Sequence, residues 1–159
     1  MKNLRLLLAA AALLAVSCSK SSTAEETTKA SASAKTGWLT SFTEAQQEAK
    51  AQNKLLFMDF TGSDWCGWCK VLEKEVFSKP EFKEYASKNL VLLELDFPRG
   101  KELPAATMEQ NQRLAVQYGI QGFPTIVVLD GSGKALAKLG YMRGGPTAFI
   151  AELEKLRKG

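Results

Sequence analysis

The residues best suited to chemistry are two cysteines, Cys66 and Cys69, separated by Gly67 and Trp68. They follow an apolar run and open a segment whose apolar residues recur at helical spacing. Two thiols in the first turn of a helix can close a disulfide with each other. The unpaired amide groups and the dipole of that turn favour a thiolate over a thiol. The sequence therefore predicts redox chemistry at this pair.

Composition excludes several other chemistries. The chain has no histidine, which rules out Ser-His-Asp and Cys-His catalysis and any histidine-ligated metal. Three cysteines are too few for a four-ligand zinc site, and Lys70 stands where haem attachment needs histidine. The net charge of +4 comes without a basic stripe interleaved with aromatics, so we expect no nucleic-acid partner. We also expect no metal and no cofactor beyond the cysteine pair itself.

Residues 1–17 are typical of an export signal. A positively charged start precedes an uncharged apolar run that is too short to span a bilayer. The run ends at Ala15-Val16-Ser17-Cys18, which resembles the lipobox of bacterial lipoproteins and implies lipidation of Cys18. An ordinary signal peptide with an incidental cysteine is the alternative. Ser19 follows instead of aspartate, which slightly favours the outer membrane as the site of anchoring on the periplasmic side.

The rest of the chain divides into a tether and one domain. Residues 18–36 are rich in Ser, Thr, Ala, Lys and Glu, lack aromatics, and are predicted to form a lipidated, flexible tether. A solubilising spacer without evolved reach is the alternative. Residues 37–159 are predicted to form one folded domain.

Helical and strand patterns alternate through this domain. Capping-box patterns at Ser41–Glu44 and Thr107–Gln110 predict two helix starts, and Pro80 and Pro146 predict two more. We expect helices at 42–52, 66–77, 80–87, 107–119 and from 146 onward, with strands at 54–60, 90–96, 125–129 and 134–139. The connections make the first two strands parallel and the last hairpin an antiparallel edge. The fold class is therefore α/β, a mixed sheet of about four to five strands flanked by helices.

With these elements in place, the chain resembles the thioredoxin superfamily. The resemblance covers about residues 38–158 and rests on Trp65-Cys66-Gly67-Trp68-Cys69-Lys70 together with Gly122-Phe123-Pro124-Thr125. It implies a thioredoxin fold and a cis peptide bond between Phe123 and Pro124; a trans proline at a strand start is the alternative. We also expect substrate contacts at Trp65, Gly67, Trp68, Phe123 and Pro124. Core filling by Trp65 and a partly packed surface position for Trp68 are the alternatives.

The resemblance further implies roles for three residues. Cys66, exposed at the helix start, would attack a target disulfide, and the more buried Cys69 would resolve the mixed disulfide. Asp59 would serve as the base that deprotonates Cys69; the alternative is an aspartate at a strand end facing solvent. Leu92 stands where thioredoxin keeps a lysine near the buried aspartate. Trp68 supplies no imidazolium, so we expect a potential toward the reducing end of the family range.

The leading functional hypothesis is a thiol–disulfide oxidoreductase that reduces or isomerises disulfides of exported proteins. It would be a monomer, anchored to a membrane by its N-terminal lipid and recharged, by analogy, by a membrane electron donor. A periplasmic dithiol oxidase and a non-catalytic binding module of the same fold are the alternatives. A thiol peroxidase is disfavoured because the Thr-x-x-Cys pattern of those enzymes is missing before Cys66.

Overall fold

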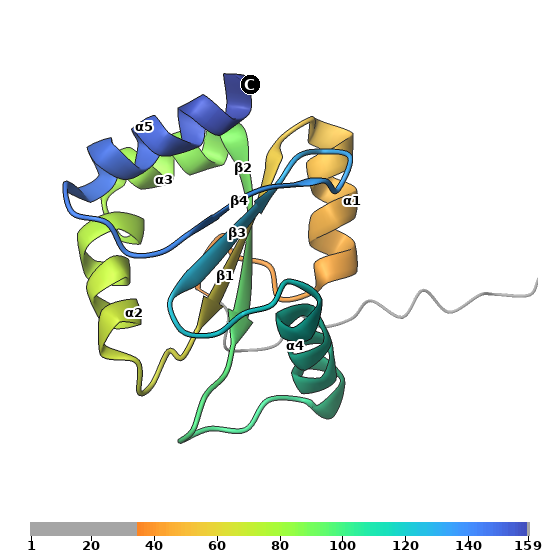
Figure 1. Ribbon diagram of the computed structural model, residues 1–159. Coiled ribbons are helices and arrows are strands. Elements are labelled where there is room, and N and C mark those ends of the chain that lie inside the picture. Colours follow the sequence, from red (N-terminus) through yellow and green to blue (C-terminus); the bar gives the residue numbers. More distant parts are fainter. Residues whose placement is uncertain (1–34, 159) are drawn as a thin grey trace, which may run out of the picture.

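The computed structural model describes residues 35–158 (Figure 1). The predicted signal peptide, Cys18 and most of the predicted tether lie outside these residues. The helices are α1 (Phe42–Gln52), α2 (Gly67–Leu72), α3 (Pro80–Asn89), α4 (Ala105–Gln117) and α5 (Gly145–Lys158). The strands are β1 (Leu55–Thr61), β2 (Leu90–Asp96), β3 (Thr125–Leu129) and β4 (Ala135–Leu139). Between residues 35 and 158, no helix is both long and apolar enough to cross a bilayer.

The four strands form one mixed sheet in the order β2-β1-β3-β4. β1 pairs in parallel with β2 and antiparallel with β3, and β4 adds an antiparallel edge. This confirms the predicted element order, the parallel first pair and the hairpin. Every residue of β1 is buried, as a central strand covered on both faces requires.

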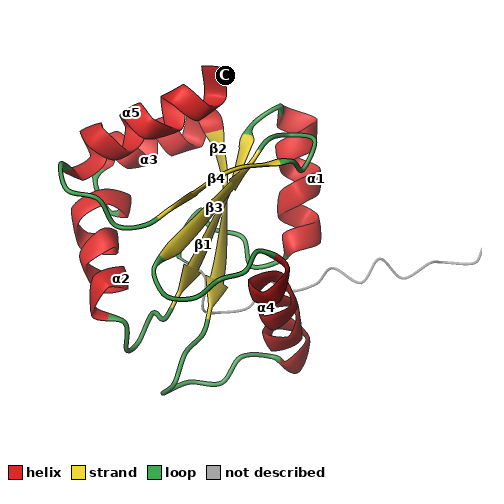
Figure 2. Ribbon diagram, viewed as in Figure 1, coloured by secondary structure: helices red, strands yellow, loops and turns green. Residues whose placement is uncertain are grey.

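Helices cover both faces of the sheet (Figure 2). One face packs against α2, α3 and α5 through an aromatic cluster centred on Phe57, whose neighbours are Trp38, Phe77, Phe82 and Phe149. The other face packs against α1 and α4 through aliphatic side chains, Met58 and Leu114 among them. The side chains of alternate β1 residues thus pack into two separate hydrophobic cores, which fixes the register of the strand.

The helix starts predicted at Ser41 and Pro80 are confirmed, α5 begins one residue before Pro146, and the start predicted at Thr107 is wrong. The Ser41 side chain accepts a hydrogen bond from the Glu44 amide and caps α1, as predicted. The capping box at Thr107–Gln110 is wrong, because α4 begins two residues earlier, directly after Pro104. Pro104 is the N-cap residue, and its carbonyl accepts hydrogen bonds from the Thr107 and Met108 amides, so the helix begins without a side-chain cap.

Gln110 does not cap its own helix, as the capping-box motif predicted, but binds main-chain groups at the start of α1. Its Oε1 accepts a hydrogen bond of 2.9 Å from the Phe42 amide, and its Nε2 donates to the Thr40 carbonyl at 2.9 Å. The side chain therefore satisfies main-chain groups at the start of α1 and ties α4 to it across the aliphatic core.

The predicted helix at 66–77 is divided. It runs as α-helix from Gly67 to Leu72 and continues as a π-helical turn over Glu73–Phe77. The π turn begins at Glu73, a residue whose carboxylate reaches the N-terminal segment described below. π-Helical turns occur often at functional sites.

We predict that Gln110→Ala lowers the free energy of unfolding by about 1–2 kcal/mol, because two main-chain groups lose their partner. Glu109→Ala is the matched control, since Glu109 is the exposed neighbour within the same motif, and it should change the value by less than about 0.5 kcal/mol. Urea denaturation followed by circular dichroism measures both. Equal effects of the two substitutions would contradict the capping role of Gln110.

Candidate active site

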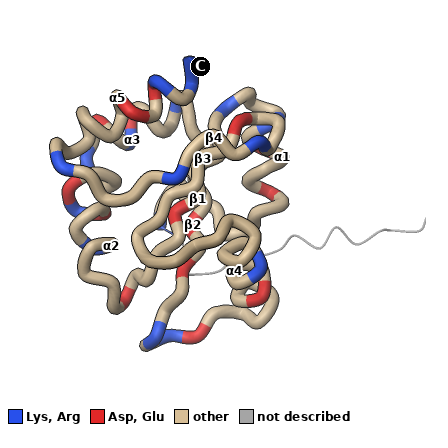
Figure 3. Tube along the Cα trace, viewed as in Figure 1, with Lys and Arg blue, Asp and Glu red and all other residues tan. Residues whose placement is uncertain are grey.

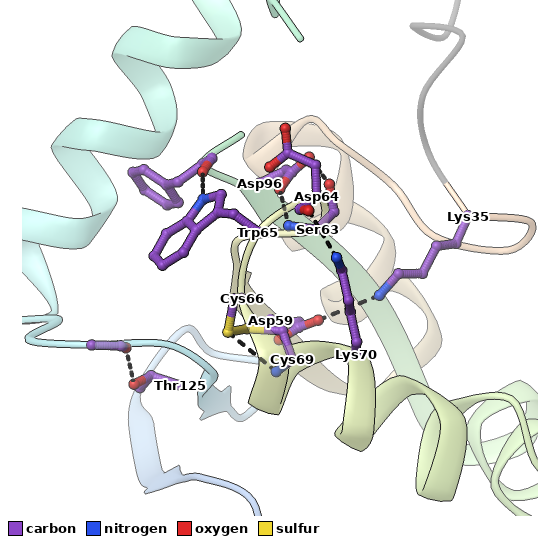
Figure 4. Close-up of a disulfide and its surroundings, with 12 residues drawn as sticks. Lys35, Asp59, Ser63, Asp64, Trp65, Cys66, Cys69, Lys70, Asp96 and Thr125 are labelled. Carbon is purple, nitrogen blue, oxygen red and sulfur yellow. Dashed lines mark hydrogen bonds and ion pairs between the residues drawn. A yellow bond between two sulfur atoms is a disulfide. The ribbon is translucent and has the colours of Figure 1, made fainter. Parts of the chain in front are cut away.

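Cys66 and Cys69 are joined in a disulfide at the N-terminal end of α2 (Figure 4). Cys66 is the N-cap residue of the helix, with an extended backbone, and Gly67 is the first helical residue. The Cys66 sulfur accepts a hydrogen bond of 3.1 Å from the Cys69 amide. A main-chain N–H of the first helical turn therefore points at the sulfur that the sequence analysis named as nucleophile.

The expected difference in exposure between the two cysteines is wrong for this disulfide form. Both residues are 6% exposed. The disulfide and the Cys69 amide hold the Cys66 sulfur inward over the helical turn, which explains why it is not the more exposed of the two. The accessible surface of the motif instead consists of Gly67 and Trp68, which are both exposed.

Trp65 is held in place on three sides. Its indole nitrogen donates a hydrogen bond of 2.8 Å to the Phe97 carbonyl, and its ring meets the Phe123 ring edge-on at 5.9 Å. A Cβ added to Gly62 would lie 2.6 Å from the indole, so only glycine leaves room for the ring. The tryptophan nevertheless remains 37% exposed beside the disulfide.

Trp68 projects from the other side of the motif. It is 61% exposed and contacts the Tyr141 ring with a centroid distance of 5.1 Å. The Tyr141 hydroxyl donates a hydrogen bond of 2.6 Å to Glu75. Trp68 is thus packed along one edge while most of its surface stays open to solvent.

The Phe123–Pro124 peptide bond is cis, which confirms the prediction. The antiparallel register pairs Thr125 with Phe60, so this loop enters the sheet beside the end of β1 from which the disulfide loop leaves. The Thr125 hydroxyl donates to the Gly122 carbonyl at 2.7 Å and closes the turn. The structure therefore brings Trp65, Trp68, Phe123 and Pro124 to the same end of the sheet as the disulfide.

Asp59 is buried within β1 and only 2% exposed, so the alternative of a solvent-facing aspartate is wrong. Within residues 35–158, its hydrogen bond and ion pair go to Lys35 rather than to a cysteine. Its second carboxylate oxygen, Oδ1, is buried and has no hydrogen-bond partner there. A buried carboxylate with one unsatisfied oxygen can accept a proton.

Lys35 was assigned to the tether by the sequence analysis, and the structure places it over a cluster of three carboxylates. Its ammonium group lies 3.5 Å from Asp59, 2.9 Å from Glu73 and 3.3 Å from Glu94. It also sits 4.6 Å from the centre of the Trp38 ring. Leu92 stands where thioredoxin has a lysine near the buried aspartate. In this chain Lys35, from the N-terminal segment, supplies the positive charge beside Asp59.

The cluster shifts the pKa values of its members. Burial, together with the charge of Glu94, raises the pKa of Asp59 to about 7, although Lys35 acts in the opposite direction. Burial likewise raises the pKa of Glu94 against the pull of Lys35. For Lys35, burial tends to lower the pKa, but the surrounding carboxylates outweigh it and raise the pKa above its usual value. Asp59 therefore changes its charge near neutral pH.

A second set of contacts joins the disulfide loop to the loop after β2. The Ser63 amide and hydroxyl both donate to Asp96, at 2.9 and 2.7 Å. The Asp64 carboxylate accepts hydrogen bonds from the amides of Arg99 and Gly100, and the Gly100 bond in particular lowers the pKa of Asp64. These contacts join residues 35 and 36 positions apart, so no local pattern in the sequence predicts them.

No group of three or more potential metal ligands occurs within residues 35–158. The cysteine pair is the reactive centre that this part of the chain offers, and its chemistry is the exchange of thiols and disulfides.

Comparisons with known proteins agree with this geometry. Residues 42–157 match the family of thioredoxin-like domains. The chain is 36% identical over 118 residues to the disulfide bond reductase DsbH of Chlamydia pneumoniae, covering 74% of this chain and 71% of that protein. It is 30% identical over 116 residues to the thiol:disulfide interchange protein DsbD of Tatumella citrea, which covers 70% of this chain but only 18% of that protein.

Solved structures show the same likeness. A structure of DsbH oxidoreductase superposes with a TM-score of 0.72 at 36% identity and covers 76% of this chain and 83% of that one. A thioredoxin from Thermus thermophilus superposes with a TM-score of 0.55 at 20% identity, covering 72% and 82% of the two chains, and supports the fold alone.

We predict that Lys35→Met lowers the free energy of unfolding of the oxidised protein by about 2 kcal/mol at pH 8, somewhat less than for a fully buried pair. The pKa of Asp59 in the fold lies above its unfolded value, so its ionisation destabilises the fold as the pH rises through about 7. Lys35 reduces that cost when Asp59 is charged. At pH 5 Asp59 is protonated, so the loss of unfolding free energy in Lys35→Met should be smaller than at pH 8. Urea denaturation at the two pH values measures it.

Lys88→Met is the matched control, because Lys88 makes an exposed ion pair with Glu84. It should change the free energy of unfolding by less than about 0.5 kcal/mol at either pH. A deficit of Lys35→Met that stayed the same at pH 5 and pH 8 would contradict the electrostatic account of the cluster.

Proposed function

The chain belongs to the thioredoxin-like family and is a thiol–disulfide oxidoreductase, and we propose that it acts as a reductase of disulfides in exported proteins. Cys66 would be the nucleophile and Cys69 the resolving cysteine. The observation that carries the assignment of Cys66 as the nucleophile is the hydrogen bond from the Cys69 amide to its sulfur. In the dithiol form the same N–H would stabilise a Cys66 thiolate, the species that attacks a disulfide.

The reaction would balance as a two-electron exchange. The Cys66 thiolate attacks one sulfur of the target disulfide, a mixed disulfide forms, and the other target sulfur leaves as a thiolate. Cys69 loses its proton and attacks the Cys66 sulfur, which closes the Cys66–Cys69 bond and releases the second target thiolate. The target is then reduced, and the protein is oxidised, as the structure shows it. A donor dithiol would return the two electrons.

Electrostatics support reduction over oxidation. Two buried carboxylates, Asp59 and Glu94, and the partly exposed Glu73 surround the single ammonium of Lys35. The chain has no histidine to place an imidazolium beside Cys66. A dithiol is strongly oxidising when its thiolate form is well stabilised. Negative charge in this cluster works against such stabilisation. The name of the relative, disulfide bond reductase, points the same way.

Asp59 would act as the base for Cys69. It is buried in β1, its Oδ1 lacks a hydrogen-bond partner within the described residues, and its pKa of about 7 suits proton acceptance near neutral pH. Glu94, on the neighbouring strand and in register with Asp59, would adjust that pKa upward. Proton removal from Cys69 would therefore depend on the charge state of the cluster.

A substrate would bind across the aromatic surface around the disulfide. Trp65 and Trp68 flank Cys66, Gly67 is exposed between the two cysteines, and Phe123 and Pro124 enter from β3. The open space around Gly67, where an added Cβ would contact nothing within 4 Å, leaves the main chain approachable. An extended target segment could lie across these groups with its disulfide over Cys66.

The remaining proposals concern the surroundings of the protein. We propose export across a membrane, lipidation at Cys18 and anchoring of a monomer on the periplasmic side, with the outer membrane favoured, on the basis of the sequence of residues 1–19. Because that compartment is oxidising, a membrane reductase related in role to the interchange protein DsbD would supply the electrons.

The redox potential tests the direction of electron flow. We predict that the full chain carrying Cys18→Ser, which leaves two thiols, equilibrates with glutathione at a potential closer to about −270 mV than to about −120 mV. It should also reduce insulin with dithiothreitol as the electron source. Cys66→Ser should abolish turnover, and Cys69→Ser should accumulate the mixed disulfide. A potential near about −120 mV would instead identify a dithiol oxidase.

We further predict that Asp59→Asn slows the release of target from the mixed disulfide by about 100-fold at pH 7, the lower end of the usual effect of a general base. The deficit should shrink above about pH 9, where Cys69 ionises without help. Stopped-flow measurement of single turnover with a fluorescent disulfide peptide gives this rate as a function of pH.

Glu94→Gln distinguishes the role of Asp59 as the base from the effect of the neighbouring charges on the pKa of Asp59. Its charge raises the pKa of Asp59, so its removal should move the midpoint of the pH profile below about 7 and leave the plateau rate within about threefold. If Asp59→Asn and wild type resolved the mixed disulfide equally fast at pH 7, Asp59 would not be the base.

A further inference from the structure

Arg99 stands at the tip of the loop that follows β2, beside the disulfide loop. Its guanidinium carbon lies 3.8 Å from the centre of the Trp65 ring, in stacking contact. Trp65 directly precedes Cys66, so this charge sits next to the proposed nucleophile in the chain. Figure 3 shows basic residues at the tip of this loop, at the same end of the sheet as the start of α2.

Hydrogen bonds within the protein hold the main chain at Arg99 in place without a bound partner. The Asp64 carboxylate accepts hydrogen bonds from the Arg99 amide, at 3.1 Å, and from the Gly100 amide. A Cβ on Gly100 would lie 3.1 Å from the same carboxylate, so the approach is close. The loop therefore loses little conformational entropy on binding a partner, which favours its use in recognition.

Within residues 35–158 no carboxylate lies within ion-pair distance of the Arg99 guanidinium, whereas Lys101 on the same loop pairs with Asp96 at 2.9 Å. Lys70 donates to the Asp64 carbonyl. The Asp64 carboxylate is occupied by main-chain amides, and Arg99 is exposed. A guanidinium that stacks on an indole keeps its in-plane N–H donors free for a bidentate carboxylate.

We propose that Arg99, stacked on Trp65, binds an aspartate or glutamate side chain of the substrate close to the disulfide under attack. This inference rests on the proposed function and adds to it a substrate class, acidic segments around the target cysteine. Trp65 supplies the apolar floor and Arg99 the paired donors. Trp65 directly precedes Cys66 in the chain. A substrate carboxylate bound by Arg99 over Trp65 would therefore lie beside the residue whose sulfur reacts.

The experiment compares three disulfide peptides that differ at one residue near the cysteine, which is Glu, Gln or Lys. With the full Cys18→Ser chain at low ionic strength, kcat/KM should be about five- to tenfold higher for the Glu peptide than for the Lys peptide. Arg99→Glu should reverse the order. Arg99→Lys keeps the charge but loses the planar fork, and it should retain only part of the preference.

Lys50→Glu is the matched control, because it makes the same charge change on an exposed residue in the last turn of α1, toward the opposite end of the sheet. It should leave the order of the peptides unchanged. Equal kcat/KM for the three peptides with wild type, or equal loss of preference in Lys50→Glu and Arg99→Glu, overturns the proposal.

Two further measurements keep this inference separate from the reductase proposal. The uncharged hydroxyethyl disulfide should be reduced equally by wild type and Arg99→Glu; a large loss in the variant would show that Arg99 acts on the dithiol rather than on substrates. Binding of the same peptides with serine for cysteine to the oxidised protein, followed by fluorescence anisotropy, needs no turnover. Tighter binding of the Glu peptide supports the site even if no peptide is reduced, and equal binding overturns it.

Discussion

The parallel pairing of β1 with β2 is the constraint on which the site depends. Its register places Thr61 opposite Asp96, so the disulfide loop and the loop carrying Arg99 leave the sheet at the same edge. The Phe97 amide donates to the Thr61 carbonyl at 2.9 Å at that point, and the contacts of Ser63 and Asp64 follow directly from it. A shift of one residue would turn the side chains of β1 to the wrong faces and separate these loops.

The second organising element is electrostatic. A central strand buried on both faces would ordinarily be apolar throughout, yet β1 carries Asp59, and β2 carries Glu94 beside it. Such burial costs stability, which Lys35 offsets only in part, as the raised pKa values indicate. Proteins retain arrangements of this kind where function needs them, and the proton transfer proposed at Cys69 is such a function.

Much of this arrangement could be predicted from the sequence. Apolar runs indicate the strands, and the bounds of Leu90–Asp96 and Thr125–Leu129 agree with the structure because a proline or a polar residue stands at or next to each limit. Local motifs gave the cap at Ser41 and the cysteine pair. The prediction from the motif at Thr107 was wrong, because α4 begins directly after Pro104 and Gln110 instead accepts a hydrogen bond from the distant Phe42 amide.

The parts that sequence reasoning missed all depend on contacts between distant residues. Lys35 meets Asp59 across 24 positions, and Asp64 meets the loop amides across 35 and 36. No local pattern announces such contacts, since a lysine among Ser, Thr and Ala has the composition of a linker. The exposure of Cys66 was misjudged for a related reason: the direction of a sulfur at a helix start depends on whether it is bonded to its neighbour.

The origin of Lys35 in the N-terminal segment has a practical consequence for how this domain is delimited. The family match begins at residue 42, and a fragment trimmed to 42–157 would be a natural choice for expression or for transplanting the domain into another protein. Such a fragment would keep both cysteines, the cis-proline loop and every strand. It would also leave three acidic groups without the ammonium of Lys35, and the pKa of Asp59 would differ from that in the intact chain.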